Sequence, residues 1–101
     1  MGLLDLLFGN KQNTIKEFQK RGAIIIDVRT ASEYQQGAIK GSKNMPLQTI
    51  SSKINDIKKL NKPVITCCAS GMRSGSAASI LKSNGIEAVN GGGWMSLQTK
   101  L

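Results

Sequence analysis

The stretch VITCCASGMRSGSAAS, residues 64–79, places two adjacent cysteines between a β-branched apolar run and a segment of small residues. The apolar run is too short for a core helix and predicts a buried strand over residues 63–67. Beyond the loop, apolar residues recur at helical spacing, so we expect a helix over residues 74–84 with Gly85 at its C-terminal cap. A strand, a tight loop and a helix in this order are typical of a parallel sheet with crossover connections.

Further strands are predicted on both sides of this unit. Apolar runs indicate strands over residues 23–28 and 86–89, and Pro46 restricts another, at residues 43–47, to a short one. The glycines at 91–93 are interpreted as a break in regular structure. Strands that alternate with helices favour an α/β fold, in which a mostly parallel central sheet is flanked by helices.

Helices are predicted between these strands. The segment TIKE, residues 14–17, has the spacing of a capping box, so a helix should begin at Thr14 and end at Gly22. The clearest amphipathic pattern covers residues 47–60, where apolar side chains recur every three or four positions. Shorter helices are expected at residues 32–36 and 94–101.

The length of 101 residues fits one domain, which we place at residues 13–101 after an apolar leader at residues 1–12. The leader is interpreted as a segment that covers the core or mediates self-association, with contact to a membrane surface as the alternative. It is shorter than the roughly 20 apolar residues that span a bilayer, so no stable membrane insertion is expected.

The formal net charge of +8 suits an anionic partner. Nucleic acid is not favoured, because the lysines are scattered, aromatic residues are few and no nucleic-acid-binding motif is present. A small anion or an acidic protein is the simpler expectation.

The sequence contains two cysteines, Cys67 and Cys68, and no histidine. A disulfide between neighbours in sequence is sterically awkward, so both thiols are expected to be free, which favours the cytoplasm. The absence of histidine from the sequence excludes a Cys-His dyad and every metal site that needs histidine.

A nucleophilic Cys68 therefore needs another device to stabilise its thiolate. The loop after it supplies backbone amides, a helix start and Arg73, and Gly71 permits a tight path. Lowering a thiol pKa by two units requires about 2.7 kcal/mol. A helix terminus gives about 0.3–1 kcal/mol, so direct amide bonds and Arg73 should contribute most. Cys67 is interpreted as a small apolar core residue.

Several motifs in order resemble those of the single-domain rhodanese-like sulfurtransferases. IIIDVRTASEYQQGAIKGSKNMPL, residues 24–47, is similar to the family pattern that begins with Asp-Val-Arg after a strand. CASGMRS, residues 68–74, is similar to the active-site loop Cys-x-x-Gly-x-Arg-Ser, and residues 77–97 resemble the closing elements of the family. Ala38 stands where the family commonly has histidine. The resemblance covers nearly all of residues 13–97 and implies a rhodanese-like three-layer fold.

The resemblance also implies an activity. Cys68 would accept a sulfane sulfur from a small anionic donor such as thiosulfate and pass it, as a persulfide, to cyanide, a thiol or a sulfur-relay protein. No metal or organic cofactor is implied. The donor and the persulfide would be held by the loop residues Ala69, Ser70, Gly71, Met72, Arg73 and Ser74. Asp27, Arg29 and Glu33 also match the family pattern, and a structural role is favoured for them.

Two other functions remain open at this point. Cys67 and Arg73 have the Cys-x5-Arg spacing of loops that bind phosphate or arsenate, which would make the protein a phosphatase or an arsenate reductase. Gly71 lies three residues after Cys68, as glycine commonly does after such a nucleophile, and this register favours Cys68. The domain could also be a binding module or a persulfide carrier without turnover, and Cys67 could be a resolving thiol.

Overall fold

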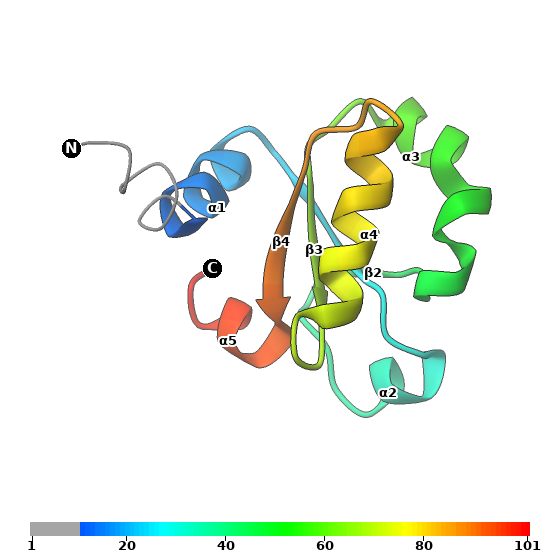
Figure 1. The fold of residues 1–101 in the computed structure, drawn as a ribbon. Helices are drawn as coiled ribbons and strands as arrows, with labels where there is room; N and C mark the ends of the chain where they lie inside the picture. The colour runs from blue at the N-terminus through cyan, green and yellow to red at the C-terminus, as the bar shows by residue number, and fades with distance from the viewer. Residues whose placement is uncertain (1–10) are drawn as a thin grey trace.

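A four-stranded parallel sheet forms the centre of the molecule (Figure 1). The computed structural model describes residues 11–101. The strand order is β2-β1-β3-β4, and the expected α/β arrangement is confirmed. The bounds of the strands are Ile24–Asp27 for β1, Lys43–Asn44 for β2, Val64–Cys68 for β3 and Ala88–Gly93 for β4.

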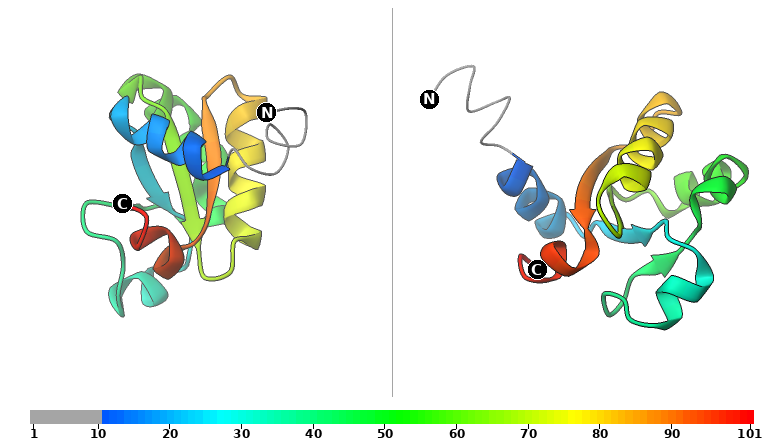
Figure 2. Two further views of the ribbon diagram at one scale, coloured as in Figure 1. Left: turned by 90° about the vertical axis from the view of Figure 1, so that its left-hand side faces the viewer. Right: turned by 60° about the horizontal axis from the view of Figure 1, so that its bottom comes forward.

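Helices cover both faces of this sheet and make three layers, as Figures 1 and 2 show. One layer holds α1 and α5, and the other holds α4, α3 and the 3-10 helix η2. The short helix α2 lies near the carboxyl ends of the strands (Figure 1). The bounds of the helices are Lys11–Lys20 for α1, Ala31–Gln35 for α2, Leu47–Lys53 for η2, Ile54–Leu60 for α3, Met72–Ser83 for α4 and Trp94–Gln98 for α5.

The central strand β3 separates two apolar cores because successive side chains of a strand point to opposite faces. All five of its residues are buried. Ile65 and Cys67 belong to the core that contains residues of α1 and α5. Val64 and Cys68 belong to the core that contains residues of α3, α4 and η2. The two cysteines therefore lie in different environments although they are neighbours in sequence.

The start of the first helix differs from the prediction. The helix α1 begins at Lys11, so Thr14 lies inside it and does not cap it. Of the leader predicted at residues 1–12, residues 1–10 lie outside the described residues, and residues 11 and 12 belong to α1. None of the helices within residues 11–101 combines the length and the apolar character needed to cross a membrane.

The amphipathic segment 47–60 is helical as predicted, but its first half is the 3-10 helix η2. The side chain of Thr49 donates to the carbonyl of Pro46 at 2.7 Å, and that of Ser52 donates to the carbonyl of Thr49 at 2.8 Å. Hydroxyl bonds to carbonyls three residues earlier compete with α-helical pairing, which explains the tighter turn.

The prediction that residues 91–93 break regular structure is wrong, because β4 continues through Gly93. The reason is close packing of the backbone. A Cβ atom added at Gly91 would lie 2.8 Å from the side chains of Ile65 and Leu97 and from the carbonyl oxygen of Thr66. One added at Gly93 would lie 2.8 Å from the carbonyl oxygen of Ala69. Glycine is thus required where β4 contacts β3 and the cysteine loop.

We expect Gly91→Ala to lower the free energy of unfolding by about 1–3 kcal/mol, because the added methyl group overpacks the space between β3 and α5. Gly85→Ala is the control: nothing lies within 4 Å of its Cβ, so only its left-handed φ of +79° is strained. Urea denaturation of both variants and the parent measures the difference. A Gly91→Ala protein as stable as the parent would contradict this packing.

Candidate active site

The loop between β3 and α4 lies at the carboxyl end of the central strand, where parallel α/β sheets bind their ligands. β3 ends at Cys68 and α4 begins at Met72. Gly71 is the N-cap residue and has a φ of 101°, a backbone conformation that favours glycine. The chain can therefore turn from strand to helix within three residues, 69–71, and fold back over the sulfur of Cys68.

Three donors surround the sulfur of Cys68. The amides of Gly71 and Ser74 donate to its Sγ at 3.0 and 3.4 Å, and the hydroxyl of Ser74 lies 3.3 Å from it. Burial alone would raise the pKa of Cys68. The hydrogen bonds from Ser74, Gly71 and the amide of Ser70 favour the anion, and the pKa of this thiol is lowered.

The predicted loop residues thus contribute unequally. Among the described residues, the amides that stabilise the sulfur come from Ser70, Gly71 and Ser74. The contribution of the amides of Ala69, Met72 and Arg73 stays a prediction for a sulfur atom added to Cys68.

Asn90 joins β4 to this loop, and the sequence analysis missed it. Its Nδ2 donates to the carbonyl of Gly71 at 3.0 Å, and its Oδ1 accepts from the hydroxyl of Ser74 at 2.7 Å and the amide of Gly92 at 2.9 Å. Ser74 has one hydroxyl proton, which either Asn90 or the thiolate can accept. When the hydroxyl turns toward the thiolate, the amide of Gly92 still satisfies Asn90.

Cys67 lies on the opposite face of the sheet from this loop. Its side chain is fully buried, and the pKa of its thiol is raised to about 12, first by burial and then by the negative charge of Asp27. A thiol in this state is a poor nucleophile. The prediction of a core role for Cys67 agrees with this environment.

Asp27 and Arg29 form a buried ion pair that holds the neighbouring segments in place. The guanidinium of Arg29 donates to both carboxylate oxygens of Asp27, the shortest contact being 2.7 Å. It also donates to the carbonyl of Gly37 at 2.8 Å, and it lies 4.7 Å from the centre of the Trp94 ring. The pair therefore ties α5 and the end of the α2 segment to β1, in line with the structural role that was favoured.

Arg73 contacts Glu33 instead of the sulfur. Its guanidinium donates to the two carboxylate oxygens of Glu33 at 2.8 and 3.0 Å. Glu33 also accepts from the amide of Thr30 at 3.1 Å, while the hydroxyl of Thr30 accepts from the amide of Glu33, which makes a capping box at the start of α2. The hydrogen bonds from Arg73, followed by those from Thr30, lower the pKa of Glu33 to about 2.

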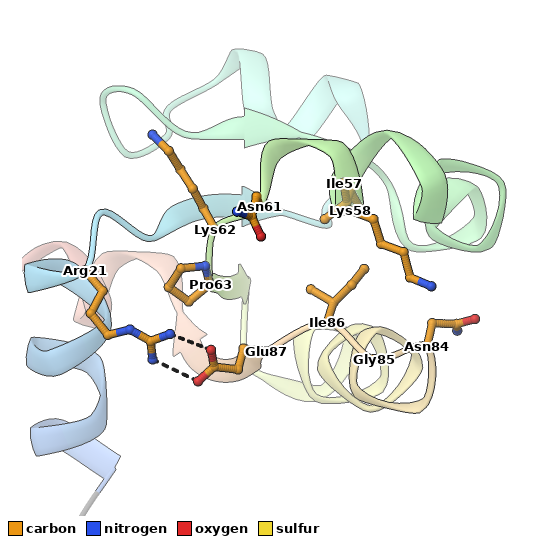
Figure 3. Close-up of a pocket in the computed structure, with 10 residues that line it drawn as sticks. All are labelled: Arg21, Ile57, Lys58, Asn61, Lys62, Pro63, Asn84, Gly85, Ile86 and Glu87. Carbon is orange, nitrogen blue, oxygen red and sulfur yellow. Dashed lines mark hydrogen bonds and ion pairs between the residues drawn. The ribbon is translucent and has the colours of Figure 1, made fainter.

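A hollow of about 250 Å³ lies beside this ion pair and is lined by Arg29, Glu33, Gln36, Gly37, Trp94 and Met95. A larger hollow, of about 370 Å³, lies at the amino ends of β3 and β4 and includes the ion pair of Arg21 and Glu87 (Figure 3). The lining of the larger one contains no cysteine, so the candidate site is the one at the loop end of the sheet. Within residues 11–101, no group of three or more potential metal ligands occurs.

Comparison with known proteins agrees with this architecture. The family model described as the rhodanese-like domain matches residues 11–100. The chain is 40% identical over 81 residues to the uncharacterized protein YqhL of Bacillus subtilis, covering 78% of the chain and 64% of that protein, which is less than two thirds of its length. It is 34% identical over 76 residues to the thiosulfate sulfurtransferase GlpE of Pseudoalteromonas translucida, covering 75% and 71% of the two chains. A rhodanese-like domain protein from Staphylococcus aureus is similar in structure, with a TM-score of 0.70, 34% identity and 86% of each chain covered.

We expect Ser74→Ala to raise the pKa of Cys68, because it removes the hydroxyl that favours the thiolate. The measurement is the pH dependence of alkylation by iodoacetamide, followed by mass spectrometry in a Cys67→Ser background. Its midpoint should move to higher pH. Ser76→Ala, at an exposed position of the same helix, is the control and should leave the midpoint in place. A midpoint that stays unchanged in Ser74→Ala would rule out this role of the hydroxyl.

Proposed function

Because this chain belongs to the rhodanese-like domain family, we propose that it is a sulfurtransferase that carries a sulfane sulfur as a persulfide on Cys68. The observation that carries the proposal is the set of hydrogen bonds from Gly71 and Ser74 to the sulfur of Cys68. A stabilised thiolate is the form of cysteine that attacks sulfur. The named activity of the relative from Pseudoalteromonas translucida supports the same chemistry.

The reaction consists of two displacements at sulfur. With thiosulfate as the donor, the thiolate of Cys68 attacks the outer sulfur, a new S–S bond forms, and sulfite leaves with the electrons of the old bond. An acceptor then attacks the terminal sulfur of the persulfide, and Cys68 leaves as a thiolate. With cyanide the product is thiocyanate, and with a thiol it is a new persulfide. Both steps use only the donor, the acceptor and Cys68.

The loop amides stabilise negative charge on sulfur in both steps. The terminal sulfur of the persulfide carries the negative charge that the thiolate carried before, so donors that point into the loop stabilise both states.

The acceptor in the cell is proposed to be a thiol, either of a small molecule or of a sulfur-relay protein. The cytoplasmic location indicated by the free thiols stays a prediction.

Phosphatase or arsenate reductase chemistry through Cys67 is less well supported. The thiol of Cys67 belongs to the core on the α1 and α5 side, and its pKa is raised to about 12. Under the proposal the Cys-x5-Arg spacing from Cys67 to Arg73 is coincidental, because the loop closes on Cys68. A carrier without turnover would share the loading step and differ only in the transfer to an acceptor.

Cys68→Ser is expected to abolish sulfur loading, and Cys67→Ser should retain most of it. Intact-protein mass spectrometry after incubation with thiosulfate and removal of excess donor measures the mass of one added sulfur atom. Cyanide treatment should then remove that mass from the parent and from Cys67→Ser. Equal loss of loading in both variants, with the fold intact by circular dichroism, would contradict the assignment to Cys68.

A further inference from the structure

The arginines next to the cysteine loop are both neutralised by carboxylates. Arg73 forms a two-point ion pair with Glu33, and Arg29 forms one with Asp27. The family resemblance implies that Arg73 helps to hold the anionic donor. Once Glu33 is counted, the Arg73 pair carries no net charge, and its attraction for a distant dianion is largely cancelled.

Glu33 is held in this position by contacts that do not involve Arg73. The capping box with Thr30 fixes its side chain at the start of α2. Its backbone carbonyl accepts from Arg29 at 3.4 Å, which connects it to the buried pair with Asp27. The carboxylate is charged at neutral pH, and the hydrogen bonds from Arg73, followed by those from Thr30, lower its pKa to about 2.

The Glu33–Arg73 pair is also electrostatically coupled to the reactive sulfur. The pKa of Arg73 is raised, first by its hydrogen bonds to Glu33 and, among smaller causes, by the charge of Cys68. Arg73 directly precedes Ser74, whose amide lies 3.4 Å from the sulfur, and Arg73 binds Glu33 at 2.8 Å, so a dianion that approaches Cys68 also meets the field of the Glu33 carboxylate. Both side chains of the pair are 37% exposed, so this effect acts through partly solvated space and is moderate.

Apolar side chains are exposed near the loop and beside the hollow next to Glu33. Met72, which directly follows Gly71, is 81% exposed, and Met95, beside the hollow next to Glu33, is 68% exposed. Trp94 lines the same hollow. Exposed methionines suit contact with apolar groups of variable shape.

We propose that Glu33 is a specificity-determining residue that, by neutralising Arg73, disfavours thiosulfate relative to a persulfide donor whose thiol carries uncharged, apolar neighbours. The inference rests on the proposed function, because it concerns the donor that loads Cys68. The loading step is R–S–SH plus the Cys68 thiolate giving R–S⁻ and the Cys68 persulfide. The S–S bond of the donor breaks, the new S–S bond forms, and the donor thiol leaves as a thiolate.

The test compares two donors, thiosulfate and the persulfide of N-acetylcysteine amide. Single-turnover loading of Cys68, followed by mass spectrometry, gives a half-saturating concentration and a maximal rate for each donor. The variants are Glu33→Gln, Arg73→Ala and the double variant. Glutamine at the third helical position also completes a capping box, so Glu33→Gln preserves the start of α2.

Glu87→Gln is the matched control. Glu87 forms a two-point ion pair with Arg21 at the other end of the sheet, with contacts of 2.8 and 2.5 Å (Figure 3). Its substitution removes the same charge and the same kind of pair, but it leaves the loop unchanged. It separates a local effect of Glu33 from the effect of the total charge.

For Glu33→Gln we expect the half-saturating concentration of thiosulfate to fall about three- to tenfold, with the maximal rate unchanged. Arg73→Ala should raise that concentration, because Glu33 is then left unpaired, and the double variant should return toward the parent. Loading by the persulfide of N-acetylcysteine amide should change little in all of them. Glu87→Gln should behave like the parent with both donors.

An unchanged half-saturating concentration of thiosulfate in Glu33→Gln, or an equal change for both donors, would overturn the role of Glu33 while the proposed sulfur transfer stands. The same holds if Glu87→Gln has as large an effect as Glu33→Gln. If neither donor adds a sulfur to Cys68 in the parent, the proposed function fails, and the inference fails with it.

Discussion

The backbone of β4 approaches the cysteine loop so closely that only glycine fits at the contact. A Cβ atom at Gly71 would lie 3.2 Å from the Cα of Gly92, and one at Gly93 would lie 2.8 Å from the carbonyl oxygen of Ala69. The pairing of β3 and β4 also shifts register between Thr66 and Cys68. An irregularity of this kind changes the direction of a side chain, and here Asn90 bonds to both the loop carbonyl and Ser74. The backbone amides that reach the sulfur are held in position by these contacts.

Strand alternation explains why adjacent cysteines differ so strongly. Cys67 is buried in the core beside the carboxylate of Asp27 and has a raised pKa, whereas Cys68 accepts hydrogen bonds from the loop and the start of α4 and has a lowered one. The sequence predicted this division, because the glycine, the arginine and the helix start follow Cys68 at the spacing that a tight loop requires. The strands and α4 were predictable from periodicity, because the apolar residues of each element are buried at the spacing that a strand or a helix imposes.

Features that depend on contacts between distant segments could not be predicted in this way. Residues 91–93 were interpreted as a break because glycine has a low strand propensity, yet packing against β3 and the loop requires it there. Asn90 carried no signal apart from its place before three glycines, which is also typical of a turn. Glu33 matches the family pattern, but its ion pair with Arg73 joins residues 40 positions apart, and no local pattern indicates it.

A crystal structure of the thiosulfate-treated protein would show whether the loop holds a sulfur atom added to Cys68. We expect one additional sulfur bonded to the Sγ of Cys68, within about 3.5 Å of backbone amides of residues 69–74. An additional sulfur on Cys67, or one on Cys68 that points away from those amides, would contradict it.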